Sequence, residues 1–332
     1  MTFKQILSDL GNKVYYPVYF LMGEEPYFID VITNYIAEKV LAENEKAFNQ
    51  TIIYGRETDV LSIVSQAKRF PMMSNHQVVI IREAQTVRNI EDLLSYVENP
   101  LKSTLLVICY KYKTLDKRKK IAKKLIENGV LFESKKLWDN QVQEWISAFL
   151  KEKKYQINPK ASLLLTEFLG TDLGKIVNEL DKLMLNIPPQ TEITTVHIEE
   201  NIGVSKDFNN FELHKAIGSR DIYKANQIVN HFAANIRNNP LTLTLASLCS
   251  FFSKTLSYHY IKDRSRNNVA SVLNINPFFV RDYEISAKNY NIGRLVNIIS
   301  HLREYDAKSK GLGNSTTTDG ELLRELMYKI LH

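Results

Sequence analysis

The chain has 332 residues, which at roughly 150 residues per domain predicts about two domains, or three small ones. Lys and Arg number 43 against 37 Asp and Glu, so the net charge is +6, and 44% of the residues are hydrophobic. This composition excludes intrinsic disorder of the whole chain, and the mild positive charge only weakly suggests a polyanionic partner. Only 12 Gly and 9 Pro are present, and so few helix breakers favour long helices.

The first 140 residues alternate short apolar runs with amphipathic stretches. The runs at residues 18–22, 49–54, 76–81, 104–109 and 130–132 are predicted to be strands. They are near-continuous and rich in β-branched residues, which is typical of strands buried on both faces. The predicted helices cover residues 27–42, 58–69, 89–97 and 116–128, the last with Asp116 as its N-cap and Gly129 as its stop. Strand–helix alternation predicts a parallel sheet with right-handed crossovers, hence an α/β domain.

Beyond about residue 140 the strand signal vanishes and helical patterns follow one another. The predicted helices cover residues 141–154, 159–169, 172–185, 193–202, 209–218, 221–236, 240–261, 265–273, 277–290, 292–308 and 319–331. Breaks fall at residues 218–219, 238–240, 276–277 and 311–314. The sequence therefore predicts an α/β domain over residues 1–140, a small helical domain over 141–208 and a larger helical domain over 209–332.

The two cysteines, Cys109 and Cys249, lie far apart, each within an apolar run. This excludes a disulfide scaffold and a cysteine-based zinc site, and we expect two buried thiols in a reducing compartment. Residues 1–13 lack the apolar core of a secretory signal, and no stretch of about 18 apolar residues exists to span a membrane. A cytoplasmic protein without a membrane partner is the expectation.

The loop after the first strand lacks the features of a phosphate-binding loop, which needs closely spaced glycines, a lysine and a hydroxyl that holds magnesium. Here Gly23 is followed by Glu24, Glu25 and Pro26, so the loop has two carboxylates and no lysine. The third strand ends in Arg82, where a magnesium site needs an aspartate. The sequence predicts no nucleotide site and no cofactor.

Other catalytic patterns are equally absent from the sequence. The seven histidines show no paired-ligand spacing, and no G-x-S-x-G elbow occurs. We therefore expect no catalytic site in this chain and no metal site. A binding or structural role is the favoured interpretation.

Residues 70–75 form a candidate binding loop between a helix and the third strand. Phe70, Pro71, Met72 and Met73 are its apolar members, and methionine is flexible enough to fit a partner's apolar groove. If both methionines became buried at an interface, each would contribute roughly 1.5–3 kcal/mol. The alternative is that they cap this domain's own core.

A basic segment follows the fourth strand, with eight cations against one acidic residue, Asp116. The cations are Lys111, Lys113, Lys117, Arg118, Lys119, Lys120, Lys123 and Lys124. We expect Leu115, Ile121, Ala122, Leu125 and Ile126 to form a buried stripe that turns the cations outward. Lys117, Lys120 and Lys124, and in the last domain Lys262, Arg264 and Arg266, are candidate contacts to nucleic-acid phosphates. A merely solvated face, or docking of an acidic neighbour, remains an alternative for both clusters.

Three stretches carry a family resemblance: residues 19–27, residues 172–183, and a third running from 276–280 to 305–311. They resemble, in order, the strand with a degenerate phosphate loop, the lid-domain signature and the collar helices of one family. That family is the delta subunit of the bacterial DNA polymerase III clamp loader, a member of the clamp-loader AAA+ group without a working ATP site. The resemblance implies an AAA+-like first domain, a lid-like second domain and a collar domain.

The resemblance also implies partners and a role. Delta subunits join ATP-hydrolysing gamma/tau copies and a delta-prime subunit, and they hold the beta sliding clamp open for placement around primed DNA. In the family, two adjacent apolar residues before the third strand plug a pocket on the clamp. These correspond to Met72 and Met73, with Phe70 and Pro71 shaping the approach, whereas well-known members have a Leu-Phe pair.

Two alternatives stay open at this point. An active AAA+ ATPase, either a loader or a helicase-loading motor, would need the phosphate loop and the magnesium aspartate that Glu24, Glu25 and Arg82 replace. A stand-alone DNA-binding module would use the basic segment and bind duplex DNA with strong salt dependence.

Overall fold

The computed structural model describes residues 1–203, 205, 207–313 and 316–332. The chain forms two compact units. One comprises Met1–Leu137 with Asp172–Gly174, and the other comprises Trp138–Thr171 with Lys175–His332. The last residue of the break predicted at 311–314, and residues 204 and 206 of the predicted small helical domain, lie outside the described residues.

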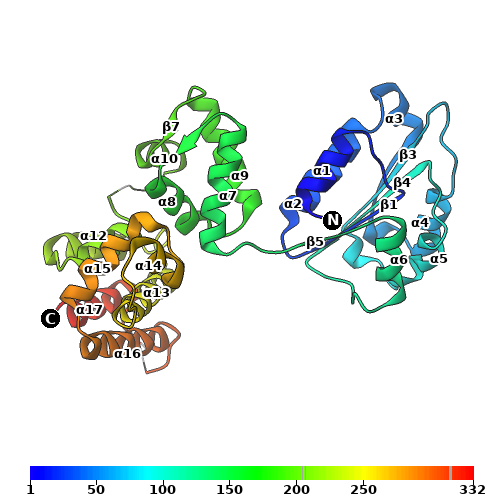
Figure 1. Cartoon of the computed structure of the whole chain (residues 1–332). Coiled ribbons are helices and arrows are strands. Elements are labelled where there is room, and N and C mark those ends of the chain that lie inside the picture. The colour runs from blue at the N-terminus through cyan, green and yellow to red at the C-terminus, as the bar shows by residue number, and fades with distance from the viewer. Residues whose placement is uncertain (204, 206, 314–315) are drawn as a thin grey trace. The chain divides into compact units, whose positions relative to one another are not determined.

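The first unit is built on a five-stranded parallel sheet with the order β2-β3-β4-β1-β5 (Figure 1). Its strands are β1 (Val18–Gly23), β2 (Gln50–Tyr54), β3 (Gln77–Arg82), β4 (Thr104–Lys111) and β5 (Val130–Ser134). All five predicted strands are therefore confirmed. Burial on both faces holds for most of β1, β3 and β4, but it is wrong for β2, which lies at the edge and leaves Ile52 and Tyr54 exposed.

Helices cover both faces of this sheet. They are α1 (Phe3–Gly11), α2 (Pro26–Lys39), α3 (Glu43–Asn49), α4 (Val60–Ala67), α5 (Leu94–Val97) and α6 (Lys120–Asn128), with the short 3₁₀ turns η1 (Gly55–Glu57), η2 (Ala84–Thr86) and η3 (Ile90–Leu93). Successive residues of a strand point to opposite faces. Tyr19 and Leu21 accordingly join the core under α1 and α2, while Phe20 and Met22 join the core under α4 and α6. Figure 1 shows these two groups of helices on either side of the strands.

Two helices of this unit were not predicted from the sequence. In α1, the Thr2 hydroxyl accepts from the backbone N–H of Gln5, and Ile6 and Leu10 are buried one turn apart. In α3, Glu45 accepts from the backbone N–H of Ala42, but the helix has only seven residues and no apolar stripe. A helix without hydrophobic periodicity gives no sequence signal.

The predicted helix 116–128 begins four residues later, at Lys120. Asp116 is not its N-cap: the Asp116 carboxylate accepts from the backbone N–H of Arg118 at 2.9 Å and so closes a turn ahead of the helix. Gly129 ends α6 as predicted. Ile126 was expected in the buried stripe, but its side chain is 62% exposed.

The second unit is helical. Its first part contains α7 (Asp139–Glu152), α8 (Pro159–Leu169), α10 (Thr195–Ile202) and α9 (Leu173–Asn186), except that Leu173 and Gly174 at the start of α9 belong to the first unit. The rest contains α11 (Asn210–Gly218), α12 (Ile222–Ala234), α13 (Leu241–His259), α14 (Arg266–Leu273), η4 (Pro277–Phe279), α15 (Val280–Asn289), α16 (Ile292–Ser309) and α17 (Asp319–Leu331). Every helix predicted after residue 140 is present. The expected absence of strands is wrong, since β6 (Gln156–Ile157) and β7 (Glu192–Ile193) form a two-residue parallel pair.

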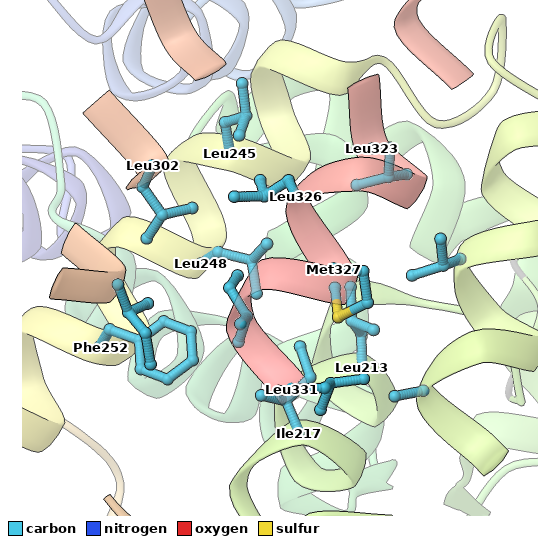
Figure 2. Packing of buried hydrophobic residues seen from close by; sticks show 14 of the residues in the cluster. Leu213, Ile217, Leu245, Leu248, Phe252, Leu302, Leu323, Leu326, Met327 and Leu331 are labelled. Carbon is cyan, nitrogen blue, oxygen red and sulfur yellow. The ribbon is translucent and has the colours of Figure 1, made fainter. Parts of the chain in front are cut away.

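The core of α11–α17 is assembled around the C-terminal helix. Figure 2 shows Leu323, Leu326, Met327 and Leu331 of α17 among apolar side chains of other helices. These partners include Leu213, Ile217, Leu245, Leu248, Phe252 and Leu302. This interior is large enough to hold the helices together as a folded body, because each fully buried apolar side chain contributes roughly 1.5–3 kcal/mol.

The two cysteines lie in different environments. Cys109 on β4 is buried, its sulfur lies 3.2 Å from the Thr33 hydroxyl, and burial raises its pKa to about 11. Cys249 on α13 is exposed, so the expectation of two buried thiols is wrong for this residue. Both lie in apolar runs, but a helix presents one side of such a run to solvent. The fold class, an α/β domain with a parallel sheet followed by helical structure, is confirmed.

Candidate functional site

The candidate binding loop lies between α4 and β3, and we call residues 70–73 the apolar loop. Its side chains point into solvent: Phe70 is 76% exposed, Met72 59% and Met73 103%. Pro71 is half-buried. The alternative that both methionines cap the domain's own core is therefore wrong. Three exposed large apolar side chains within four residues make this loop a candidate interaction site.

The chain on the C-terminal side of the apolar loop is hydrogen-bonded to the end of α4 and to β4. Gln77 is the first residue of β3, and its buried amide donates to the carbonyl oxygens of Gln66 (3.0 Å) and Ala67 (3.3 Å) and to the Thr104 hydroxyl (2.9 Å). The Thr104 hydroxyl donates in turn to Ala67 at 2.8 Å. These buried bonds supply side-chain donors to the Ala67 carbonyl at the end of α4, whereas the Gln66 carbonyl also accepts from the Arg69 N–H at 3.2 Å. The end of α4 and the start of β3 are thus fixed relative to each other.

Met72, within the apolar loop, is hydrogen-bonded to a residue of α3. The amide of Asn49 donates to the Met72 carbonyl oxygen at 2.9 Å and accepts from the Met72 backbone N–H at 2.7 Å. Met73 has a left-handed backbone with φ of +51°. Sequence reasoning missed Asn49, because nothing in the pattern of residues 43–49 marks its side chain as a partner of a residue 23 positions away.

The loop after β1 has three of its backbone donors, those of Gly23, Glu24 and Tyr27, engaged within the fold. Gly23 N–H donates to Lys113 (3.1 Å) and Glu24 N–H donates to Ser134 (2.9 Å), both to carbonyl oxygens. The Glu25 carboxylate accepts from the backbone N–H of Tyr27 at 3.1 Å and caps α2. Burial raises the pKa of Glu25, and the hydrogen bond from Tyr27 opposes that rise. A phosphate needs such N–H groups free and aimed at it, so these residues do not fit a bound nucleotide.

Two further observations concern catalytic chemistry. The Arg82 guanidinium at the end of β3 donates to the Asn34 side chain at 3.2 Å, which leaves a cation where a nucleotide hydrolase needs a magnesium ligand. Across the described residues, no group of three or more His, Cys, Asp or Glu is placed to hold a metal ion.

Within the same residues, no helix is long and apolar enough to cross a membrane.

The basic segment is folded against carboxylates. Each of the three candidate phosphate-binding lysines pairs with a glutamate: Lys117 with Glu133, Lys120 with Glu98 at 2.6 Å and Lys124 with Glu127 at 2.6 Å. Lys119 also pairs with Glu91, at 2.7 Å. The sequence of the segment suggests a strong positive field, but carboxylates from β5 and from the α5 region neutralise much of it.

The second basic cluster spans the connection from α13 to α14 and the first residue of α14. The Arg266 guanidinium donates to the Pro277 carbonyl oxygen at 2.7 Å, and the Arg264 guanidinium lies over the Tyr258 ring, 5.4 Å from its centroid. Lys262 is exposed. Two of the three cations therefore already have contacts within the fold.

Comparison with known proteins gives the class of this α/β and helical chain. A family model described as DNA polymerase III, delta subunit, matches residues 19–135, and one described as the C-terminal domain of the same subunit matches residues 207–328. Together they span well over half of the chain. The chain belongs to the DNA polymerase III delta subunit family, as the resemblance read from the sequence implies.

Two relatives from Bacillus subtilis are similar along the whole length. DNA polymerase III subunit delta of strain 168 is 26% identical over 334 residues, covering 97% of this chain and 94% of the relative. The solved structure of the DNA clamp loader delta protein is 23% identical with a TM-score of 0.55, and it covers 99% of both chains. The second likeness supports the fold described above.

Proposed function

We propose that this chain is a non-catalytic subunit of the DNA polymerase III clamp loader, and that it binds the beta sliding clamp through the apolar loop. The observation that carries the proposal is the exposure of Phe70, Met72 and Met73 in a member of the delta subunit family. The position of these residues, directly before β3, corresponds to the family's clamp-binding plug. The engaged donors of the loop after β1 support a role that does not include ATP hydrolysis.

Clamp opening follows from differential binding. A ligand shifts a conformational equilibrium only by the difference between its affinities for the two states. The apolar loop opens the clamp if its pocket is better formed when one clamp interface is parted. Burying the two methionines would supply roughly 1.5–3 kcal/mol each, which together is about two to four decades of affinity.

The remaining domains have roles in assembly under the same proposal. Residues 1–140 form the AAA+-like clamp-binding domain, residues 141–208 a lid-like domain and residues 209–332 the collar domain that joins the gamma/tau and delta-prime subunits. The large core of α11–α17 supports a stable helical body for such packing. Primed DNA is met only within the assembled cytoplasmic complex, since the neutralised basic segment gives little support to a stand-alone DNA-binding module.

The test changes the two methionines of the apolar loop and measures binding to the sliding clamp of the same organism by surface plasmon resonance. The double variant Met72→Ser/Met73→Ser is expected to lose at least about a hundredfold in affinity while keeping its fold by circular dichroism. The matched control is Ile126→Ser, since Ile126 is an equally exposed apolar residue on α6 of the same unit. Unchanged affinity of the folded double variant would reject the proposal.

A further inference from the structure

The contact between α3 and the apolar loop is bidentate. The Asn49 amide places one donor and one acceptor side by side, and the backbone of Met72 presents the complementary pair at 2.9 Å and 2.7 Å. The second donor of the amide goes to the Glu45 carbonyl oxygen, at 3.2 Å, within α3. Both donors of the amide and one of the two lone pairs of its oxygen are therefore used, and two of these three bonds go to one residue of the loop.

This contact is shielded from water, although the side chains that it supports are not. Asn49 is only 3% exposed, whereas Met73, the residue after its partner, is fully exposed. A buried amide that loses its partners pays the desolvation of its polar atoms, so the paired arrangement is strongly preferred over an open one. The hold on Met72 is thus a fixed feature of the fold.

The backbone conformation of Met73, the residue after this contact, has to be enforced by its surroundings. Met73 has φ of +51°, a left-handed conformation that residues with a side chain adopt only where their surroundings enforce it. Gln77 fixes the chain four residues later through its bonds to the end of α4. Residues 73–76 are therefore fixed at one end by the hydrogen bonds between Asn49 and Met72 and at the other end by those of Gln77. The turn at Met73 directs its side chain into solvent.

We infer that Asn49 is a positioning residue that presets the apolar loop for its partner by holding the Met72 backbone. The inference rests on the proposed function, because the partner is taken to be the sliding clamp. A loop that is already in its bound conformation loses less freedom on binding. If only a fraction of the molecules holds that conformation, the apparent affinity falls by the same fraction.

The experiment compares Asn49→Ala with Asn128→Ala. Asn128 is a matched control because its side-chain amide also donates to two backbone carbonyls, those of Val97 (2.9 Å) and Glu98 (3.2 Å), in the same unit. Both variants are expected to lower the melting temperature. Only Asn49→Ala is expected to weaken clamp binding, by about tenfold and mainly through a slower association rate.

A conservative variant separates positioning from general stability. Asn49→Asp keeps an acceptor for the Met72 N–H but sets a buried carboxylate oxygen against the Met72 carbonyl, so it should weaken clamp binding at least as much as Asn49→Ala. Amide hydrogen exchange gives a direct readout. The Met72 N–H should exchange faster in Asn49→Ala, while the amides of β3 stay as protected as in the wild type.

The outcomes distinguish this inference from the proposal beneath it. If Met72→Ser/Met73→Ser loses clamp affinity but Asn49→Ala and Asn49→Asp bind as tightly as Asn128→Ala, the positioning role is wrong and the clamp-binding role stands. If the double serine variant binds normally, the clamp-binding role itself is wrong. Should Asn49→Ala fail to fold, Asn49→Asp still decides, since wild-type affinity in that variant contradicts the positioning role.

Discussion

The carboxylate of Glu25 accepts a hydrogen bond from the backbone N–H of Tyr27, 3.1 Å away, at the first turn of α2. This is the place where a bound phosphate would sit if the loop after β1 gripped a nucleotide. The protein's own side chain supplies the negative group that the helix N-terminus attracts. The N-terminus of α2 is in this way capped by a group of the chain itself.

Replacing Glu25 tests the cap. Glu25→Ala is expected to lower the free energy of unfolding by about 1 kcal/mol, because the Tyr27 N–H loses its partner. Glu25→Gln keeps an acceptor and should cost less. Chemical denaturation measures both, with Glu24→Ala, an exposed neighbour, as the control. Calorimetric titration with ATP and magnesium should detect no binding to the wild type or to any variant, and binding by the wild type would contradict our account of the loop.

The ion pairs of the basic segment give a prediction about DNA. Glu91, Glu98 and Glu133 pair with Lys119, Lys120 and Lys117. Changing these three glutamates to glutamine frees the three lysines without altering any cation. Duplex DNA binding, measured by fluorescence anisotropy, should become tighter, and its dependence on salt should steepen by about one to two units of log K per log [salt].

A control for that variant is Glu284→Gln, which releases Lys288 on α15 from a pair of 2.8 Å. It should leave DNA binding unchanged. Equal salt dependence of the wild type and the triple variant would contradict the idea that the carboxylates mask a phosphate-binding surface.

The half-buried His214 gives a pH dependence. It lies on α11, its ring stacks on Phe251 with centroids 4.8 Å apart, and its Nε2 lies 3.1 Å from the Ser247 hydroxyl. Burial, with a smaller contribution from Lys254, lowers its pKa from 6.5 to about 3. Between about pH 6.5 and pH 3, His214 is therefore protonated in the unfolded chain but neutral in the folded chain. The free energy of unfolding consequently decreases as the pH falls from about 6.5 toward 3.

His214→Phe removes this titration and keeps a ring beside Phe251. The slope of unfolding free energy against pH between 6 and 4 should flatten by up to about 1.4 kcal/mol per pH unit. His301→Asn, which changes a more exposed histidine, serves as the control. A slope as steep in His214→Phe as in the wild type would show that other groups cause the acid sensitivity.

Much of the architecture was predictable because local signals agreed with the fold. Helix α8 was predicted with the bounds that it has, since Asn158 accepts from the Ala161 N–H, Pro159 opens the helix and Gly170 ends it. The strands were readable for a similar reason: continuous apolar runs ended at Gly23 and Gly55. Signals of this kind depend only on neighbouring residues.

The candidate site was predictable only in part. The apolar loop was visible as a cluster of large apolar residues beside Pro71, but its exposure depends on the way in which α3, α4 and β3 meet. The role of Asn49 and the pairing of Lys120 with Glu98 depend on contacts between residues more than twenty positions apart. Spacing along a chain carries no information on such contacts.

Both hydrogen bonds between Asn49 and Met72 are made to the main chain of Met72 and do not involve its side chain. The identities of residues 72 and 73 can therefore change without disturbing the scaffold that presents them. Another pair of apolar side chains at these two positions would alter the shape of the loop's tip alone, while the frame behind it stays the same.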